Sequence, residues 1–336
     1  MESAKTGRRP RFSDHDKAAV ARPWGSCWTP AAGRRRGISA AEVLVILVVV
    51  VVVVLVLLLA LPRQREVARL AACRRNLMQI GVALELYERS EGRLPTVPTL
   101  TADPASSGGP LKSLLDALVQ PDLTGLTDVS RPPKPQPGRV PGERPVPGFV
   151  CPSDLTAFSE GRLPAPVSYR ATAGDSPLGG TGAFAPGRSI RLAEIEDGDG
   201  RSFTAAFSER LLGRNVRGPM DYMVVDGPLT GDRCPSSAEA RWRGDAGASW
   251  AEASWRSTLY NHALTPNAAP SCVADDGSSA FMGASSGHVG GVNVLIFDGS
   301  VRTVSPTVAP PVWKALATTH SPAPPPPRVE PSKEPR

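Results

Sequence analysis

The sequence has few of the residues from which catalytic and metal sites are built. Only four of its 336 residues are histidine, and His15 and His320 lie towards the two ends, which leaves His262 and His288. The sequence also lacks a Cys-x-x-Cys pair and a His-Glu-x-x-His motif, which are common spacings of zinc ligands. These absences argue against a zinc site and against a zinc peptidase. We predict a protein that is not an enzyme and that has no metal and no cofactor.

Aromatic residues are also scarce, at 5% of the chain, whereas 36 prolines and 32 glycines make up about a fifth of it. So many turn-forming residues argue against regular structure throughout the chain. Aliphatic residues remain frequent enough to form a core, which argues against a wholly disordered chain. We therefore expect a loop-rich extracytoplasmic protein whose packed core is shorter than the chain.

Most of the chain has no excess of positive or negative charge. The net charge is +6, but residues 1–37 contain nine Lys or Arg and three Asp or Glu, whereas residues 38–336 contain 29 of each. The excess positive charge therefore lies entirely in the first 37 residues, which we interpret as a basic cytoplasmic leader. Because the remainder is formally neutral, we predict no nucleic-acid partner.

One long segment lacks polar side chains altogether. The 19 residues from Val43 to Leu61 are all apolar, and a helix of this length nearly crosses a hydrocarbon layer of about 30 Å. We predict a transmembrane helix over residues 38–61, with the lipid bilayer as a partner. A cleaved secretory signal is the alternative, but its apolar region would be only about 7–15 residues long.

Arginines flank this segment on both sides, so charge alone barely decides its orientation. The preceding region is short and basic, and long following domains are translocated largely regardless of charge. We therefore expect a single-pass protein of the inner (cytoplasmic) membrane, with its N-terminus in the cytoplasm and its C-terminal domain outside.

A glutamate stands at the start of the apolar segment. Three arginines at 34–36 are followed by Gly37, and four residues beginning with Ile38 separate Gly37 from Glu42. A cut after Gly37 would expose a positive amine on Ile38, which Glu42 of a neighbouring copy could neutralise. The alternative is an interfacial glutamate that reaches water.

This pattern resembles the prepilin cleavage and methylation segment of type IV pilins and type II secretion pseudopilins. The resemblance implies cleavage between Gly37 and Ile38 by a prepilin peptidase and methylation of the new N-terminus. It also implies that Glu42 sets the register between subunits.

The residues after the apolar segment have helical periodicity. Pro62 is expected to kink the helix or to begin a new one, and Gly92 and Pro95 to end it. Steps of three and four residues place one stripe on a core-facing side: Leu70, Cys73, Leu77, Ile80, Leu84 and Tyr87. We predict an amphipathic helix over residues 62–92 that continues the stalk.

Residues 93–317 contain short strand-like segments separated by turns, and we predict an extracytoplasmic β-rich domain. Prolines exclude regular structure from a loop near 128–148, and residues 318–336 are expected to form a disordered Pro-rich tail. Near the end of the domain, aliphatic residues on both sides of Asp298 and Gly299 predict a hairpin with a tight primed turn. We assign structural roles to seven residues around it: His288, Gly290, Gly291, Asn293, Asp298, Gly299 and Arg302.

Matching blocks scattered over residues 65–318, including Arg65–Arg69, Gly287–Arg302 and Trp313–Thr318, resemble a large bacterial family with a domain of unknown function. In that family the domain follows a prepilin-type N-terminus, and it is also catalogued under a solute-binding-protein label. The resemblance also implies that Glu209, at the end of a strand, uses its carboxylate in a buried hydrogen bond.

Four cysteines lie beyond the apolar segment, and they permit three pairings. Because Cys73 belongs to the core-facing stripe, we expect it to meet Cys151, and we expect Cys234 to pair with Cys272. Four free buried thiols are the alternative. Cys27 lies in the leader.

These features predict an α+β, pilin-like architecture, with a long N-terminal transmembrane helix followed by a Pro/Gly-rich antiparallel β domain. The expected function is that of a noncatalytic, membrane-anchored pseudopilin-like subunit of a type II secretion or type IV pilus-like system. Its partners would be a prepilin peptidase and other pseudopilin-like subunits. The alternative is a membrane-tethered extracytoplasmic protein that binds a solute or glycan.

Overall fold

The computed structural model describes residues 39–100, 108–118, 145–154, 163–235 and 240–321. The leader with Gly37 and Ile38, most of the predicted loop near 128–148, and the tail beyond residue 321 lie outside the described residues. The chain divides into two compact units, Met1–Val56 and Leu57–Arg336.

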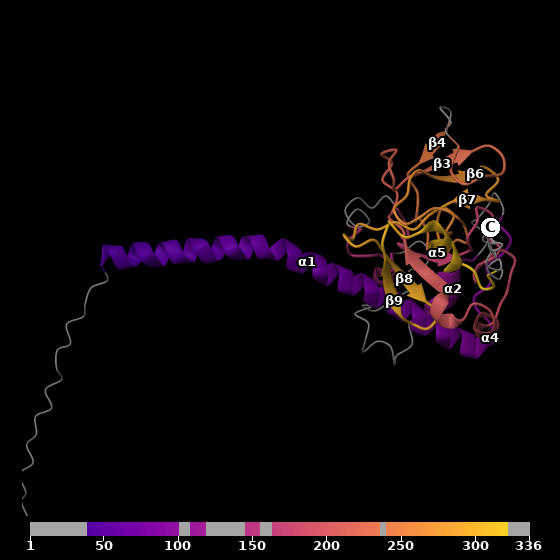
Figure 1. The fold of residues 1–336 in the computed structure, drawn as a ribbon, viewed down its shortest axis with the longest axis horizontal. Coiled ribbons are helices and arrows are strands. Elements are labelled where there is room, and N and C mark those ends of the chain that lie inside the picture. The colour runs from indigo at the N-terminus through magenta and orange to yellow at the C-terminus, as the bar shows by residue number, and fades with distance from the viewer. Residues whose placement is uncertain (1–38, 101–107, 119–144, 155–162, 236–239, 322–336) are drawn as a thin grey trace, which may run out of the picture. The chain divides into compact units, whose positions relative to one another are not determined.

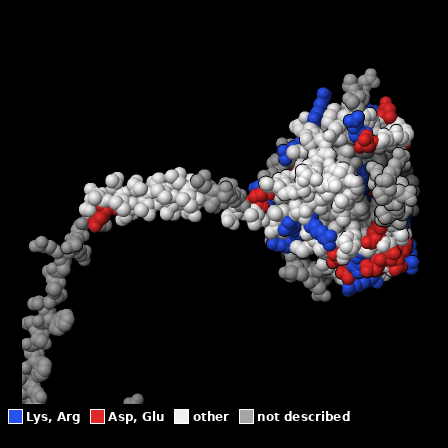
Figure 2. All heavy atoms as spheres, in the orientation of Figure 1, with Lys and Arg blue, Asp and Glu red and all other residues white. Residues whose placement is uncertain are grey.

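The first unit contains the beginning of helix α1, which runs from Ala40 to Glu91. From Ala40 to Leu58 the helix is apolar apart from Glu42 and has no buried residues. Its length and composition suit a membrane span, and a signal sequence has the same properties. Figure 2 shows that the exposed surface of this segment carries almost no charge, whereas charged side chains are spread over the β-rich unit.

A capping box begins helix α1. The backbone N–H of Ser39 donates to Glu42 Oε2 over 2.8 Å, and the N–H of Glu42 donates to Ser39 Oγ over 3.3 Å. Such reciprocal bonds satisfy two amide groups that the first helical turn leaves without partners. Glu42 therefore has a local structural role within its own chain.

In the second unit α1 continues without a break through Pro62 as far as Glu91, so no new helix begins at the proline. Four of the six residues of the predicted stripe are buried and the other two are half-buried. The helix packs closely on the domain, since a Cβ atom added at Gly81 would lie 3.0 Å from Leu295 Cδ1. The amphipathic pattern thus identified the face that packs on the domain.

The second unit contains two sheets, which are joined by long irregular segments (Figure 1). The larger has the order β5-β1-β2-β8-β9 and the smaller the order β4-β3-β6-β7. The strands of the larger sheet are β1 (Tyr169–Thr172), β2 (Ala205–Glu209), β5 (Leu259–Tyr260), β8 (Val292–Ile296) and β9 (Val301–Val304). Those of the smaller sheet are β3 (Tyr222–Val225), β4 (Arg241–Arg243), β6 (Ser271–Ala274) and β7 (Ala280–Phe281).

Both sheets are mixed, which corrects the expectation of an antiparallel domain. β1 pairs in parallel with β5, and β3 pairs in parallel with β6. Each parallel pair joins strands that are far apart in the sequence, because a parallel connection must return along the sheet before pairing. The observed class is α+β.

The inner strands of the larger sheet, β1, β2 and β8, are buried on both faces. Leu295 of β8 belongs to the core that includes α1, whereas Val294 and Ile296 face a second cluster around Trp313. Successive residues of a strand point to opposite faces, so α1 and helix α5 (Pro310–Ala315) pack against different sides. The remaining helical segments are α2 (Pro110–Leu118), α4 (Leu192–Asp197), η3 (Pro147–Phe149) and η4 (Arg201–Phe203).

The predicted hairpin is present as β8 and β9, but its turn differs from the expected primed type. Gly299 has a positive φ of 83°, whereas Asp298 is not among the described non-glycine residues with positive φ. The N–H of Gly299 donates to the Ile296 carbonyl, and the N–H of Ile296 donates to the Ser300 carbonyl. Asp298 instead accepts hydrogen bonds from Ser300 N and Oγ at 2.9 and 2.6 Å. Bonding to this side chain favours a longer turn, in which only the glycine needs the left-handed conformation.

Candidate functional site at the helix–sheet junction

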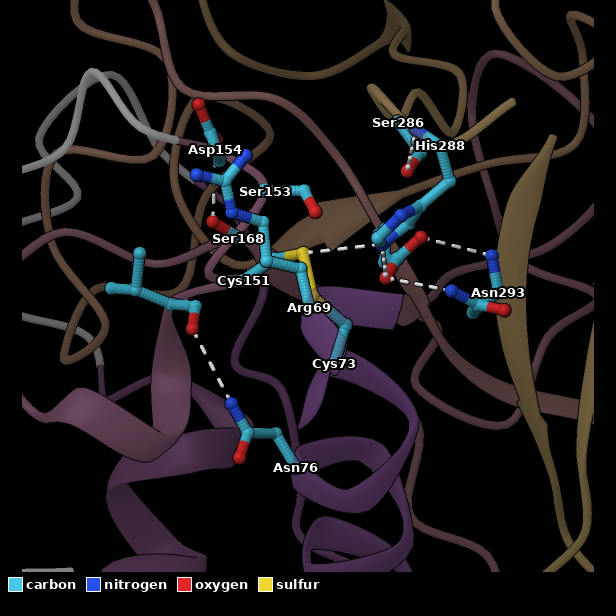
Figure 3. Close-up of a disulfide and its surroundings, with 12 residues drawn as sticks. Arg69, Cys73, Asn76, Cys151, Ser153, Asp154, Ser168, Ser286, His288 and Asn293 are labelled. Atoms are coloured by element: carbon cyan, nitrogen blue, oxygen red, sulfur yellow. Dashed lines mark hydrogen bonds and ion pairs between the residues drawn. A yellow bond between two sulfur atoms is a disulfide. The ribbon is translucent and has the colours of Figure 1, made fainter. Parts of the chain in front are cut away.

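A disulfide joins helix α1 to the segment that follows η3 (Figure 3). Cys73 and Cys151 are bonded over 2.06 Å and are 0% and 4% exposed. Beside it, Asn76 Nδ2 donates to the Val150 carbonyl over 3.3 Å. Cys234 and Cys272 form a second disulfide at 2.19 Å, within a separate small cluster of buried side chains. Both pairs are those expected from the sequence.

His288 lies against the first disulfide, and its side chain is 1% exposed. Its Nδ1 is 2.9 Å from Glu66 Oε1 on α1. Its Nε2 is 3.4 Å from Cys151 Sγ and 3.4 Å from Glu209 Oε1. The imidazole is thus held between two carboxylates and a sulfur.

Burial lowers the pKa of His288, but hydrogen bonds and charge from Glu209 and Glu66 outweigh it and raise the pKa above its ordinary value. The protonated ring can donate to both carboxylates, which is why they favour the charged form.

Glu209 ends strand β2 and closes the buried hydrogen bonds implied by the resemblance. Asn293 on β8 donates its backbone N–H to Glu209 Oε2 and its side-chain Nδ2 to Oε1, both over 3.0 Å. Asn293 Oδ1 accepts from Thr303 Oγ1 at 2.8 Å and from Arg74 Nε at 3.3 Å. Arg74 also donates to Thr303 Oγ1 over 2.6 Å, so a continuous network connects α1 with β2, β8 and β9.

The other predicted motif residues shape the backbone beside this network. Gly291 has a φ of 118°, and a Cβ atom there would collide with the Val304 carbonyl oxygen. A Cβ at Gly290 would lie 3.3 Å from a methyl group of Thr303. Arg302 pairs with Asp298 at 3.6 Å on the exposed side of the hairpin. These residues position the hairpin, and the Gly291 N–H donates to the His288 carbonyl over 3.3 Å.

Glu66 is the junction residue that sequence reasoning missed. It is a half-exposed position on the helix, and its contacts with His288 at 2.9 Å and with Ser153 at 3.4 Å, both distant in sequence, distinguish it.

Residues Gly283–Gly287 also spell Gly-x-Ser-x-Gly, the pattern of a hydrolase nucleophile elbow. Here the segment is irregular and leads into a turn instead of a helix. Ser285 Oγ accepts from the Leu211 N–H over 3.1 Å, and Ser286 Oγ accepts from the His288 N–H over 3.2 Å. Both serines therefore have structural partners in place of an elbow geometry.

Four side chains at the junction offer metal-ligand atoms that all lie within 4.8 Å of one another: Cys73, Cys151, Glu209 and His288. While the sulfurs are bonded to each other, only the histidine and the glutamate remain as ligands, which is too few for a structural zinc site. In this state the cluster acts as a structural clamp.

The family follows from the extent of the match. Residues 62–310 match the family model described as a protein of unknown function, DUF1559. The chain belongs to this family. No curated protein and no solved structure matches it.

The DUF1559 match includes every residue of the junction, and it begins after the apolar segment and Glu42. The clamp therefore lies within the matched region of this chain.

Replacing His288 in this DUF1559 protein with glutamine is expected to change how stability depends on pH. The pKa of His288 is raised in the folded chain. Its ionisation therefore adds fully to the free energy of unfolding below about pH 6.5, the ordinary pKa of histidine. This stabilisation is lost as the pH rises through the pKa of the folded chain. The stability difference between wild type and His288→Gln should therefore be larger at pH 5 than at pH 9, by urea unfolding. His320→Gln is the control, since His320 is exposed. A pH-independent difference at His288 would contradict the expectation.

Proposed function

We propose that this protein is a noncatalytic, membrane-anchored pseudopilin-like subunit of a type II secretion or type IV pilus-like system. In this proposal its N-terminus is cytoplasmic and its domain lies outside the inner membrane. A prepilin peptidase cleaves after Gly37, and other pseudopilin-like subunits are its partners.

The observation that carries the proposal is the continuity of helix α1. One helix of 52 residues includes both the apolar segment and the stripe packed in the domain core. The disulfide at Cys73 and the contact at Glu66 fix its second part to the sheets. A subunit that assembles through its N-terminal helix needs its globular part attached to that helix, and these contacts within the second unit supply the attachment.

The capping box at Glu42 is compatible with a role in subunit registration. Ser39 N–H occupies Oε2, and no described hydrogen bond occupies Oε1. After cleavage, that second oxygen could accept from the amine of Ile38 of a neighbouring copy, which would offset the cost of a charge at the membrane edge.

The test is the mass of the mature protein. Gly37→Leu is expected to block processing and to leave all 37 leader residues on the chain, whereas the wild type should begin at N-methylated Ile38. Gly33→Leu is the matched control in the same leader and should be processed normally. Intact-mass spectrometry of protein extracted from membranes distinguishes the products. Equal masses for Gly37→Leu and the wild type would overturn the pilin-like proposal.

A tethered binding protein is the second candidate, and one cavity favours it. A cavity of about 280 Å³ lies beside the second sheet and is lined in part by Tyr222, Trp255 and three arginines, Arg241, Arg243 and Arg256. Arg243 and Arg256 are already paired with acidic residues at 2.6 and 3.0 Å, which reduces the charge available to a ligand. A binder would keep its ligand affinity in the uncleaved Gly37→Leu chain.

A further inference from the structure

We propose that the helix–sheet junction is a zinc site when the Cys73–Cys151 disulfide is reduced. The ligands are the two cysteine sulfurs, His288 Nε2 and a carboxylate oxygen of Glu209. This inference goes beyond the proposed function and does not depend on it.

The ligand atoms are already close to the required spacing. Bonds of about 2.0–2.3 Å in a tetrahedral site place ligand atoms roughly 3.3–3.8 Å apart. His288 Nε2 is 3.4 Å from Cys151 Sγ and 3.4 Å from Glu209 Oε1, and all four atoms lie within 4.8 Å of one another. Breaking the disulfide removes the bond that holds the two sulfurs together, so they can separate towards the same spacing.

The surrounding hydrogen bonds hold the ligands as zinc proteins hold theirs. A zinc-bound histidine commonly donates its second ring N–H to a carboxylate, which fixes the ring. Glu66 is in that place, 2.9 Å from Nδ1, so that Nε2 faces the sulfur. Asn293 donates to both oxygens of Glu209 and fixes the carboxylate in the same way.

The burial and the donor types also fit. Cys73, Cys151, Glu209 and His288 are all at most 5% exposed, and two thiolates with one imidazole and one carboxylate are suitable ligands for Zn²⁺. The bound cation would offset the negative charge that two thiolates and Glu209 would otherwise leave in a buried position.

The disulfide is reduced by thiol–disulfide exchange. A dithiol reductant attacks the disulfide and becomes a disulfide itself, giving two electrons and two protons to the cysteine sulfurs. Zn²⁺ then displaces these two protons from the thiols. Because Cys73 lies on α1, Glu209 on β2 and His288 before β8, the helix is tied to the sheet in both states, by the disulfide or by the metal.

The experiment uses the full-length chain in detergent micelles. It is reduced with a phosphine, desalted without oxygen and incubated with Zn²⁺ or Co²⁺ alone. We expect one metal ion per reduced chain, sulfur-to-cobalt charge-transfer absorption, and protection of Cys73 and Cys151 from alkylation while Cys234 and Cys272 are labelled. The oxidised chain should bind no metal at this site.

Variants separate this site from incidental thiol binding. Cys234→Ser with Cys272→Ser should leave binding unchanged, whereas His288→Gln should lower affinity at least tenfold. Glu66→Gln should lower it about 10-fold to 100-fold through the lost orientation of the imidazole. Glu85→Gln is the control on the same helix, because Glu85 pairs with Arg89 on the exposed side.

Circular dichroism keeps the test decisive if reduction unfolds the chain. Recovery of the folded spectrum on addition of Zn²⁺ would support the site, and failure to recover it would overturn the proposal. A folded, reduced chain that takes up no metal, or that binds equally well with His288→Gln, would also overturn it.

Discussion

Replacing Cys73 and Cys151 together with alanine is expected to lower the free energy of unfolding by about 4 kcal/mol. The bond closes a loop with a sequence separation of 78 residues, and removing it releases the corresponding chain entropy in the unfolded state. Cys73 also belongs to the buried stripe of α1, so the substitution loosens the contact between the helix and the sheets.

Chemical denaturation of the oxidised full-length protein in micelles measures this loss. The pair Cys234→Ala and Cys272→Ala provides the comparison, because its separation of 38 residues predicts a loss smaller by about 0.6 kcal/mol. Cys27→Ala, in the leader, should change nothing. An unchanged unfolding midpoint for the Cys73 and Cys151 variant would show that the disulfide does not stabilise the junction.

Trp313→Ala is expected to cost about 3–5 kcal/mol, as large aromatic truncations in a core do. Trp313 is 0% exposed, and its ring stacks on His262 with centroids 3.6 Å apart. Its Nε1 donates to the Leu264 carbonyl over 2.8 Å. Its backbone carbonyl, which alanine would keep, lies 2.6 Å from His262 Nδ1. The loss of the stacked indole is therefore what changes the surroundings of the histidine.

The same variant should change the titration of His262. Burial lowers the pKa of His262 to about 3, so the ring is neutral in the folded chain over most of the accessible pH range. Removing the indole admits water and should raise this pKa towards its ordinary value. NMR titration of the ring protons measures the change, and Val312→Ala, at a 56% exposed position of the same helix, is the control. An unshifted His262 in a folded Trp313→Ala chain would contradict this account.

Local patterns predicted the parts of the fold that depend on near neighbours. The stripe from Leu70 to Tyr87 follows from steps of three and four residues, and the structure buries or half-buries all of it. The hairpin at Asp298 and Gly299 follows from a turn between two aliphatic segments. The predicted type of its turn was wrong, because hydrogen bonds from Ser300 to the Asp298 side chain favour a different backbone conformation.

Long-range pairing was beyond the reach of such patterns. Nothing near β1 indicates that it pairs with β5, or that β3 pairs with β6, so the domain was expected to be antiparallel. Strand order depends on the combined packing of both sheets with α1 and α5, and each local segment carries only part of that information.

The sequence by itself determined that this protein has an apolar segment long enough to span a membrane and an amphipathic segment that follows it. Both segments can be identified from consecutive side chains alone. The free energy of transferring each side chain from water to an apolar environment decides whether a segment suits lipid or a protein core, whatever the rest of the chain does. Only the tertiary structure decided that Glu66, Glu209 and His288 meet at the Cys73–Cys151 disulfide. These residues are far apart in the sequence, and their chemistry arises from the burial and proximity that the packed sheets impose on them.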